Sequence, residues 1–519
     1  MRTAVILLLL LAVPLLGQAP PAFPLEEATV VQLQQWMTEG RYTSRQITDL
    51  YLQRIDAIDR RGPALHAMIE LNPDARAIAD ALDRERRDKG RRGPLHGIPI
   101  VLKDNIDTGD RMLTTAGSLA LADRPAPKDA FLVARLRAAG VVILGKTNLS
   151  EWANFRSTHS TSGWSARGGL VKNPYILDRN ACGSSSGTGA AIAASLAAVG
   201  VGTETDGSIV CPSAATGLVG IKPTVGLVSR TGVIPISHTQ DTAGPMGRTV
   251  ADAVALLSAM TGADHADRAS TASARYAGRD LMRSLTAGAL RGARIGVARR
   301  KYFGYHPGTD GAIAQALGEM KAAGAILIDP ADIATASQLD ACEMPILLTE
   351  FKSDLRTYLQ ARGATANVHS LDELIAFNTR EKTRELPYFG QELFVEASRT
   401  HDVLAPEYVK ALTTCRTLSR ADGIDATLRR FRLDAIVAPT AAPAWKTDLV
   451  NGDHILGASS TPAAVAGYPS ITVPAGFVDG LPVGISFIGS AWSEPRLIEL
   501  AYSYEQATKH RRPPEFRDR

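Results

Sequence analysis

Two serines and one lysine stand in surroundings that could support nucleophilic catalysis. Ser184 lies in the glycine- and serine-rich run Cys-Gly-Ser-Ser-Ser-Gly-Thr-Gly, and Ser208 ends the run Gly-Thr-Glu-Thr-Asp-Gly-Ser. Lys103 ends the apolar run Gly-Ile-Pro-Ile-Val-Leu. A buried lysine becomes a base near neutral pH because desolvation destabilises its charged form. Such a lysine could take a proton from a serine, which predicts a serine nucleophile with no histidine involved.

Each of these motifs also has another interpretation, and no single motif is enough to decide between the two. Lys103 could be an exposed residue at a strand end, with a pKa near ~10.4. Ser208 could be a simple helix N-cap, or the turn before it could bind an oxyanion through backbone N–H groups. The run 183–187 matches G-x-S-x-G with Ser185 as nucleophile, but the polar residues before it do not form the required strand. A phosphate loop is unsupported because no Gly-Lys-Ser/Thr follows.

The elements that must position these residues alternate between short apolar runs and amphipathic segments. With 519 residues and 45% hydrophobic content, the chain can bury a large core. The pattern predicts an α/β protein with a central sheet covered on both faces by helices. We expect strands at 98–103, 141–144, 199–202, 295–298, 326–329, 435–438, 470–473 and 483–488. We expect helices at 25–36, 44–58, 72–89, 130–139, 149–155, 187–198, 250–260, 311–323, 371–377 and 495–506.

The first 19 residues are typical of an export signal. Arg2 supplies a positive charge, residues 4–16 are almost wholly apolar, and small residues follow at 17 and 19. The alternative is an uncleaved anchor, although the apolar stretch is short for a span. We expect export to the periplasm or the medium, with no stable membrane span after processing.

Charge and cysteine content narrow the class of protein further. A net charge of +4, with no basic cluster carrying interleaved aromatics, argues against nucleic acid as a partner. The four cysteines show no spacing typical of a metal site. If Ser184 and Ser208 meet in space, Cys182 and Cys211 lie close enough for a disulfide, but we favour two buried free thiols.

Taken together, Lys103, Ser184 and Ser208 resemble the amidase signature family. The two serines stand 24 residues apart, a spacing typical of that family. Further likeness lies in the runs at 217–224, 232–235 and 241–246. The resemblance spans about 25–510 and implies the family's fold, a single large domain built on a central mixed β-sheet with helices on both faces.

The resemblance also implies a role for each residue. Ser208 would be the nucleophile that forms the acyl-enzyme, Ser184 the bridging serine after a cis peptide bond from Gly183, and Lys103 the final base. Four backbone N–H groups would line the oxyanion hole, those of Thr205, Asp206, Gly207 and Ser208. The implied mechanism needs neither a metal nor a cofactor, and we expect the protein to be a monomer.

Within the family, the resemblance is strongest to bacterial enzymes that remove the C-terminal amide of peptides. It is carried by the runs at 148–155, 162–167, 202–212, 389–393 and 491–495. Val210 and Cys211 stand where relatives that act on free carboxylates often carry arginine, so a malonamate-type or tRNA-linked substrate is not expected. We therefore expect hydrolysis of the C-terminal carboxamide of peptides with release of ammonia.

Two alternatives remain for the function. The first is a broad-specificity amidase acting on small amides or aryl-acyl amides. The second is a non-catalytic binding protein on the same scaffold, an interpretation that the presence of all three residues disfavours.

Overall fold

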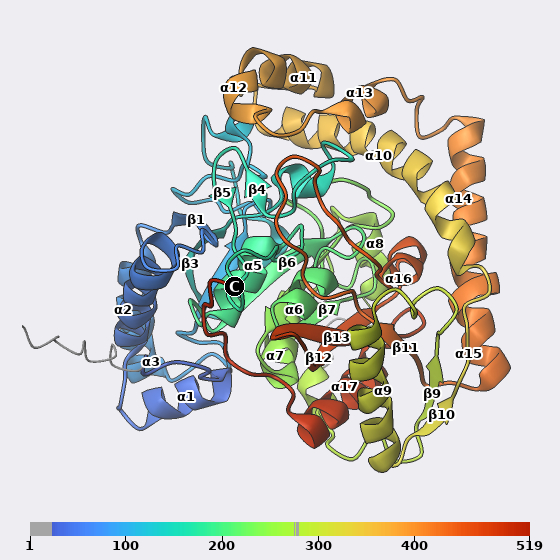
Figure 1. Ribbon diagram of the computed structural model, residues 1–519. Coiled ribbons are helices and arrows are strands. Elements are labelled where there is room, and N and C mark those ends of the chain that lie inside the picture. Colours follow the sequence, from blue (N-terminus) through green and yellow to red (C-terminus); the bar gives the residue numbers. More distant parts are fainter. Residues whose placement is uncertain (1–22, 275, 277–279) are drawn as a thin grey trace, which may run out of the picture.

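An eleven-stranded mixed sheet runs through the middle of the protein in the computed structural model (Figure 1). The structure describes residues 23–274, 276 and 280–519, so the predicted export signal at 1–19 lies outside the described residues. The sheet confirms the predicted α/β class. Its strands follow in the order β1 (Met68–Leu71), β3 (Val142–Thr147), β2 (Pro99–Lys103), β6 (Val199–Glu204), β8 (Thr242–Gly247), β7 (Val219–Lys222), β12 (Ser470–Val478), β13 (Leu481–Ile488), β11 (Ala435–Pro439), β9 (Arg294–Val297) and β10 (Ile326–Ile328). A separate hairpin joins β4 (Trp164–Ser165) to β5 (Gly169–Leu170).

Two neighbouring parallel strands, β2 and β6, end at the same edge of this sheet. Their register is set by the pairing of Ile100 with Val199. Lys103 closes β2 and Glu204 closes β6, so the residues that follow both strands meet. The carboxyl ends of parallel strands form the usual ligand-binding edge of open α/β sheets. This edge is therefore where a substrate is expected to bind.

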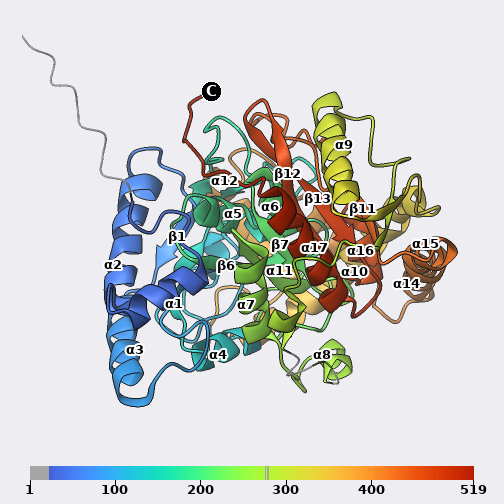
Figure 2. The ribbon, with the colours of Figure 1, turned by 90° about the horizontal axis from the view of Figure 1, so that it is seen from below.

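Helices cover both faces of the sheet (Figures 1 and 2). Gly200 of β6 lies so close to α5 that an added Cβ would meet Thr188 at 2.7 Å. Gly247 of β8 faces α7 instead, and its nearest neighbour is Ala253 at 3.1 Å. Gly200 pairs with Met246, and side chains alternate along a strand, so Gly247 points to the opposite face.

The helices of the described residues differ widely in length. Figure 1 shows α10 to α14 as an outer layer along the upper and right-hand border. Helices α10, α11 and α13 contribute to a second apolar cluster. The α-helices are α1 (Val30–Thr38), α2 (Ser44–Arg54), α3 (Ala75–Lys89), α4 (Phe131–Ala138), α5 (Ser186–Ala193), α6 (Val210–Ala215), α7 (Val250–Met260), α8 (Arg268–Ser273), α9 (Pro307–Ala322), α10 (Leu339–Ala361), α11 (Leu371–Arg380), α12 (Lys382–Glu385), α13 (Glu392–Ser398), α14 (Pro406–Ser419), α15 (Asp425–Phe431), α16 (Thr461–Ala466) and α17 (Glu494–Thr508). None of the helices in the described ranges is long and apolar enough to cross a membrane.

Several predicted elements need correction. The predicted helix at 149–155 is wrong, because Trp152, Ala153 and Asn154 all adopt positive φ. The helix predicted at 187–198 ends at Ala193, and Ser195 also adopts positive φ before β6 begins. Strands β1, β7 and β8 and the long helices α10 and α14 were not predicted.

Candidate active site

The lysine at the end of β2 is buried beside a serine from the loop before α5. The Nζ of Lys103 lies 2.7 Å from the Oγ of Ser184 and 2.9 Å from the Oγ1 of Thr203. The Lys103 side chain is fully enclosed. Burial lowers the pKa of Lys103 to about 7, although the charges of Glu204 and Asp241 oppose this shift. A substantial fraction of Lys103 is therefore neutral at pH 7 and can accept a proton.

The loop that carries Ser184 makes direct contact with the loop that carries Ser208. The peptide bond between Gly183 and Ser184 is cis, as the family resemblance implies. The carbonyl of Ser184 accepts a hydrogen bond from the N–H of Ser150 at 3.1 Å. The N–H of Ser185 donates to the carbonyl of Ser208, also at 3.1 Å. The structure thus brings together the two serines that the sequence singles out.

Ser185, the serine of the G-x-S-x-G run, has a structural task. Its hydroxyl donates to the carbonyl of Thr203 at 3.1 Å and accepts from the N–H of the same residue at 3.2 Å. No strand comes directly before it in the chain. Ser185 therefore fixes α5 to β6, and the nucleophile-elbow interpretation does not hold.

Ser208 lies in the turn between β6 and α6. Ser208 is 8% exposed, whereas Lys103 and Ser184 are fully buried. Within the described ranges, no group is hydrogen-bonded to its Oγ. The backbone N–H groups of Asp206, Gly207 and Ser208 likewise donate to no other described residue. Free N–H groups beside a free hydroxyl can stabilise an oxyanion that forms on a carbonyl attacked by that hydroxyl.

Carboxylates hold this turn in place. The Oε2 of Glu204 accepts the N–H groups of Ile209 and Val210 at 2.7 and 3.0 Å. The Oδ2 of Asp206 accepts from the hydroxyl of Thr461 at 2.7 Å. The turn is thus fixed from both sides without using the N–H groups at 206–208.

A disulfide joins the two serine-bearing segments. Cys182 and Cys211 are bonded, with their Cα atoms 6.0 Å apart. The expectation of free thiols is therefore wrong, because the contact between the serine loops also brings the two cysteines together. A second disulfide, between Cys342 and Cys415, joins α10 to α14.

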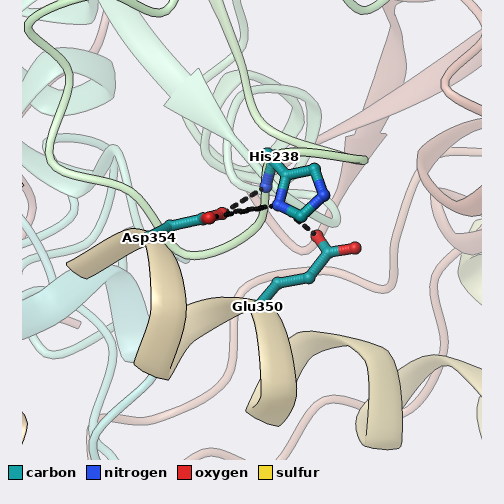
Figure 3. Close-up of side chains that lie close together, drawn as sticks. All are labelled: His238, Glu350 and Asp354. Atoms are coloured by element: carbon teal, nitrogen blue, oxygen red, sulfur yellow. Dashed lines mark hydrogen bonds and ion pairs between the residues drawn. The ribbon is translucent and has the colours of Figure 1, made fainter. Parts of the chain in front are cut away.

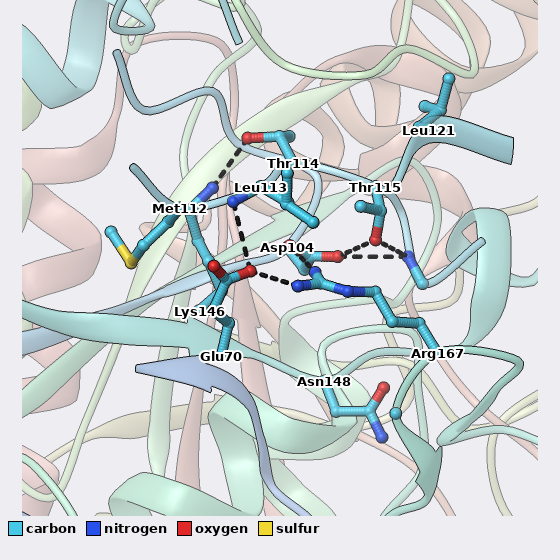
Figure 4. Close-up of polar contacts among 12 residues, drawn as sticks. Glu70, Asp104, Met112, Leu113, Thr114, Thr115, Leu121, Lys146, Asn148 and Arg167 are labelled. Carbon is cyan, nitrogen blue, oxygen red and sulfur yellow. Dashed lines mark hydrogen bonds and ion pairs between the residues drawn. The ribbon is translucent and has the colours of Figure 1, made fainter. Parts of the chain in front are cut away.

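An ionic network fixes the backbone that follows β2 (Figure 4). Arg167 forms ion pairs with Asp104, at 3.5 Å, and with Glu70 of β1. Asp104 also accepts from the hydroxyl of Thr115 and from the N–H of Gly117. In Figure 4 Arg167 lies between the two carboxylates, so the loop after β2 is tied to the edge strand of the sheet.

Two residues that contact this site, Asn105 and Thr203, have no role that the sequence predicts. The Nδ2 of Asn105 donates to the Oγ1 of Thr203 at 2.9 Å, and that hydroxyl also contacts Lys103. Strand alternation is the available signal for Thr203, because residues 199, 201 and 203 share one side of β6. Asn105 follows Lys103 by two residues, but nothing in the sequence shows where its side chain points.

A cluster of three side chains has metal-ligating types (Figure 3). His238 contacts Asp354 at 2.9 Å and Glu350 at 3.6 Å. However, hydroxyl groups already occupy both oxygens of Glu350, those of Ser237 and Tyr408. Burial opposes a charge on His238, but the bond to Asp354 and the charge of Glu350 raise its pKa above the usual value. The cluster therefore ties the 237–239 loop to α10 as an ion pair and is no open ligand set.

Comparison with known proteins identifies the class. The family model of the amidases matches residues 46–498, so the chain belongs to the amidase family and is a hydrolase acting on amides. A probable amidase of Arabidopsis thaliana is 42% identical over 508 residues, covering 95% of this chain and 92% of the relative.

Among solved structures, this chain is similar to a peptide amidase. The native peptide amidase from Stenotrophomonas maltophilia is 53% identical, with a TM-score of 0.91, covering 95% of this chain and 99% of that one. The peptide amidase in complex with the competitive inhibitor chymostatin superposes with a TM-score of 0.92. An amidase family protein from Bacillus anthracis is 36% identical with a TM-score of 0.84, covering 94% of this chain and 92% of that one.

Proposed function

We propose that this amidase hydrolyses the C-terminal carboxamide of peptides through a Ser-Ser-Lys relay. The observation that carries the proposal is the buried contact of 2.7 Å between the Nζ of Lys103 and the Oγ of Ser184, beside the free hydroxyl of Ser208. The choice of substrate is supported by the 53% identity to a peptide amidase over 95% of the chain.

In the first half of the reaction, the relay activates the nucleophile. Neutral Lys103 accepts the proton of Ser184 while Ser184 accepts the proton of Ser208. The Oγ of Ser208 attacks the carbonyl carbon of the amide, and the carbonyl oxygen becomes an oxyanion. The N–H groups of residues 205–208 bind that oxyanion, which lowers the barrier because they are already oriented by the turn.

Collapse of the intermediate reverses the proton flow. Protonated Lys103 returns its proton to Ser184, which donates its own proton to the amide nitrogen. The C–N bond breaks, ammonia leaves, and the acyl group stays on Ser208 as an ester. Water then enters, gives a proton to the same relay and attacks the ester carbonyl. The relay passes that proton to the Oγ of Ser208 as the ester bond breaks, and the peptide acid leaves and ionises to its carboxylate.

The residues after the proposed nucleophile favour an uncharged substrate. Val210 is apolar, and the sulfur of Cys211 is bonded to Cys182. Neither can pair with a substrate carboxylate. This supports a peptide whose C-terminus is a neutral amide over a substrate that keeps a free carboxylate near the scissile bond.

We also propose that the protein works in an oxidising compartment after export. The two disulfides support this, because structural disulfides persist outside the reducing cytosol. Fractionation of the producing cells, with an antibody to the mature chain, tests the localisation directly.

Ammonia release from an amidated dipeptide tests the function. Ser208→Ala should abolish release, because the variant lacks the oxygen that attacks the amide and carries the acyl group. Ser185→Ala is the matched control in the neighbouring loop and should keep measurable activity. A Ser208→Ala protein that releases ammonia at the wild-type rate would overturn the mechanism. If acetamide is hydrolysed as efficiently as the amidated dipeptide, the broad small-amide alternative replaces the peptide substrate.

A further inference from the structure

One buried acceptor beside the relay lacks a partner. Asn105 is 3% exposed, and its Nδ2 donates to Thr203. Its Oδ1 is buried, and no described residue donates to it. A buried amide oxygen without a donor costs about 1–3 kcal/mol relative to a satisfied one. Because buried polar groups in native proteins are almost always hydrogen-bonded, this oxygen is a candidate acceptor for a donor on a bound molecule.

A small cavity adjoins this oxygen. Its polar lining comes from Asn105 and from residues 203–205 of β6 and the turn after it, which include Glu204, and its apolar lining from Ala153, Val233, Ile234 and Ile236. The cavity has room for about one water-sized molecule. The carboxylate of Asp241 also lies there, but its oxygens already accept from the hydroxyl of Thr205 and from the N–H groups of Ile236 and Ser237. Asn105 and Glu204 are thus the lining side chains that each keep a buried oxygen without a donor among the described residues. Of the two, Asn105 is the one bonded to the Thr203 hydroxyl that contacts Lys103, and we therefore assign the occupant to it.

The geometry of the relay points to the occupant. The carbonyl oxygen of the substrate must face the N–H groups of residues 206–208, and its nitrogen must face the proton of Ser184. The peptide part is far too large for the cavity and must extend towards solvent. The remaining substituent, the –NH2 group, is directed to the relay side, where the hydroxyl of Thr203 links Lys103 to Asn105.

We propose that the Oδ1 of Asn105 accepts an N–H of the substrate carboxamide and so makes the enzyme select primary amides. The inference rests on the proposed hydrolysis of peptide carboxamides. It assigns the cavity beside Asn105 as the pocket for the leaving group of that reaction. Asn105 is a specificity residue that contacts the nitrogen which leaves as ammonia. The apolar walls exclude larger leaving groups because an N-alkyl substituent would overfill a water-sized space.

A pair of substrates that differ only in the leaving group tests this assignment. The same acylated dipeptide is prepared as the N-methylamide and as the methyl ester, which carry the same methyl group and differ in the N–H that the amide alone can donate. For Asn105→Ala, the ratio of N-methylamide to ester kcat/KM should fall about 5- to 150-fold, since a buried N–H is left without an acceptor. Where turnover of either compound is too slow, its inhibition constant against the carboxamide replaces kcat/KM.

Thr203→Val is the matched control. It removes the hydroxyl that contacts Lys103 and should lower kcat/KM for both substrates, leaving their ratio unchanged. If Asn105→Ala also lowers both equally, Asn105 only positions Thr203 and the proposal is overturned. Asn105→Asp keeps an oxygen at the same position, so its ratio should stay near the wild-type value. A fall of about fivefold or more in the ratio for Asn105→Asp contradicts the assignment, and this result can be obtained even if the alanine variant does not fold.

The pocket wall gives an independent measurement. Ile236 is 6% exposed and lines the cavity. Ile236→Ala should raise the N-methylamide to carboxamide ratio of kcat/KM, because the added space accepts a methyl group. An unchanged ratio would place the leaving group elsewhere. Failure of the wild-type enzyme to release ammonia from any peptide carboxamide would instead refute the proposed function, which keeps the two failures distinct.

Discussion

At the scale of single residues, the contact between Lys103 and Ser184 lets one side chain set the pH range of the reaction. Protonated Lys103 has no lone pair to accept the serine proton. Because burial lowers its pKa to about 7, the neutral form predominates only above that pH. An ordinary lysine, with a pKa near ~10.4, would be almost wholly protonated at neutral pH.

We therefore expect kcat/KM to rise through an acidic limb with an apparent pKa of about 7. At pH values below this pKa, kcat/KM should fall about tenfold for each pH unit, as for a single essential base. The measurement is a pH–rate profile on an amidated dipeptide, with protein stability checked at each pH. A profile that stays flat from pH 5 to 8 would exclude Lys103 as the base. Lys103→Ala should lower activity by several orders of magnitude at all these pH values.

The residues of the relay could be predicted from sequence, but their support could not. Lys103, Ser184 and Ser208 stand in distinctive runs whose residue types suggest chemistry without any structure. Asn105 gains its importance from one unpaired oxygen and a cavity whose walls also come from residues 153, 203–205, 233, 234, 236 and 241. Because these residues are far apart in the sequence, no local sequence pattern predicts the pocket.

At the scale of elements, the close packing of α5 on β6 positions the bridging serine. A Cβ at Gly200 would lie 2.7 Å from the side chain of Thr188 and 3.1 Å from Val101. Ser185 adds its two hydrogen bonds to Thr203 at the start of the same helix. The loop that carries Ser184 is therefore held by a helix that has no room to move towards the sheet.

Gly200→Ala should push α5 away from β6 and lower both stability and kcat. Overpacking of this kind costs about 1–3 kcal/mol of unfolding free energy. Gly318→Ala in α9 is the contrasting control, because nothing lies within 4 Å of its added Cβ. That change should stabilise the protein by about 0.4–1 kcal/mol. Urea unfolding and kcat measured side by side check both, and equal behaviour of the two variants would contradict the packing argument.

The elements that local pattern identifies are those whose residues favour them. The apolar runs of β2, β6 and β13 and the spacing of α7 predict the structure that forms. Strand β8 reads Thr-Ala-Gly-Pro-Met-Gly, and glycine and proline disfavour strands except where tertiary packing demands them. Helix α10 has Pro345 inside it, which breaks the pattern of one long helix. Both elements exist because their neighbours in the fold stabilise them.

At the scale of the whole molecule, the two disulfides close loops of different kinds. The bond between Cys182 and Cys211 spans 29 residues around the site, and that between Cys342 and Cys415 spans 73 residues in the outer helices. Loops of these lengths stabilise the folded state by about 3–5 kcal/mol each in the chain-entropy account. The sequence alone left the pairing of Cys182 with Cys211 open, because it depends on the meeting of the serine loops.

Replacing either pair by serines should lower the melting temperature. The Cys182→Ser/Cys211→Ser variant should also lose kcat, because the segments that carry Ser184 and Ser208 are no longer joined. The Cys342→Ser/Cys415→Ser variant is the matched control and should keep kcat at temperatures well below unfolding. Differential scanning calorimetry and ammonia release separate the two effects. Equal loss of kcat in both variants would show that the first disulfide has no special connection to the site.

The disulfide at the site has a further consequence for damaged enzyme. Cys182 and Cys211 close a covalent ring of backbone that contains Ser184, Thr203 and Ser208. A protease that cuts once inside this ring produces two new ends but no separate fragments. The nicked chain would migrate as one band until a reductant is added, and then as two. Even a cleaved molecule would therefore keep its two serines on a single covalent body for as long as its surroundings stay oxidising.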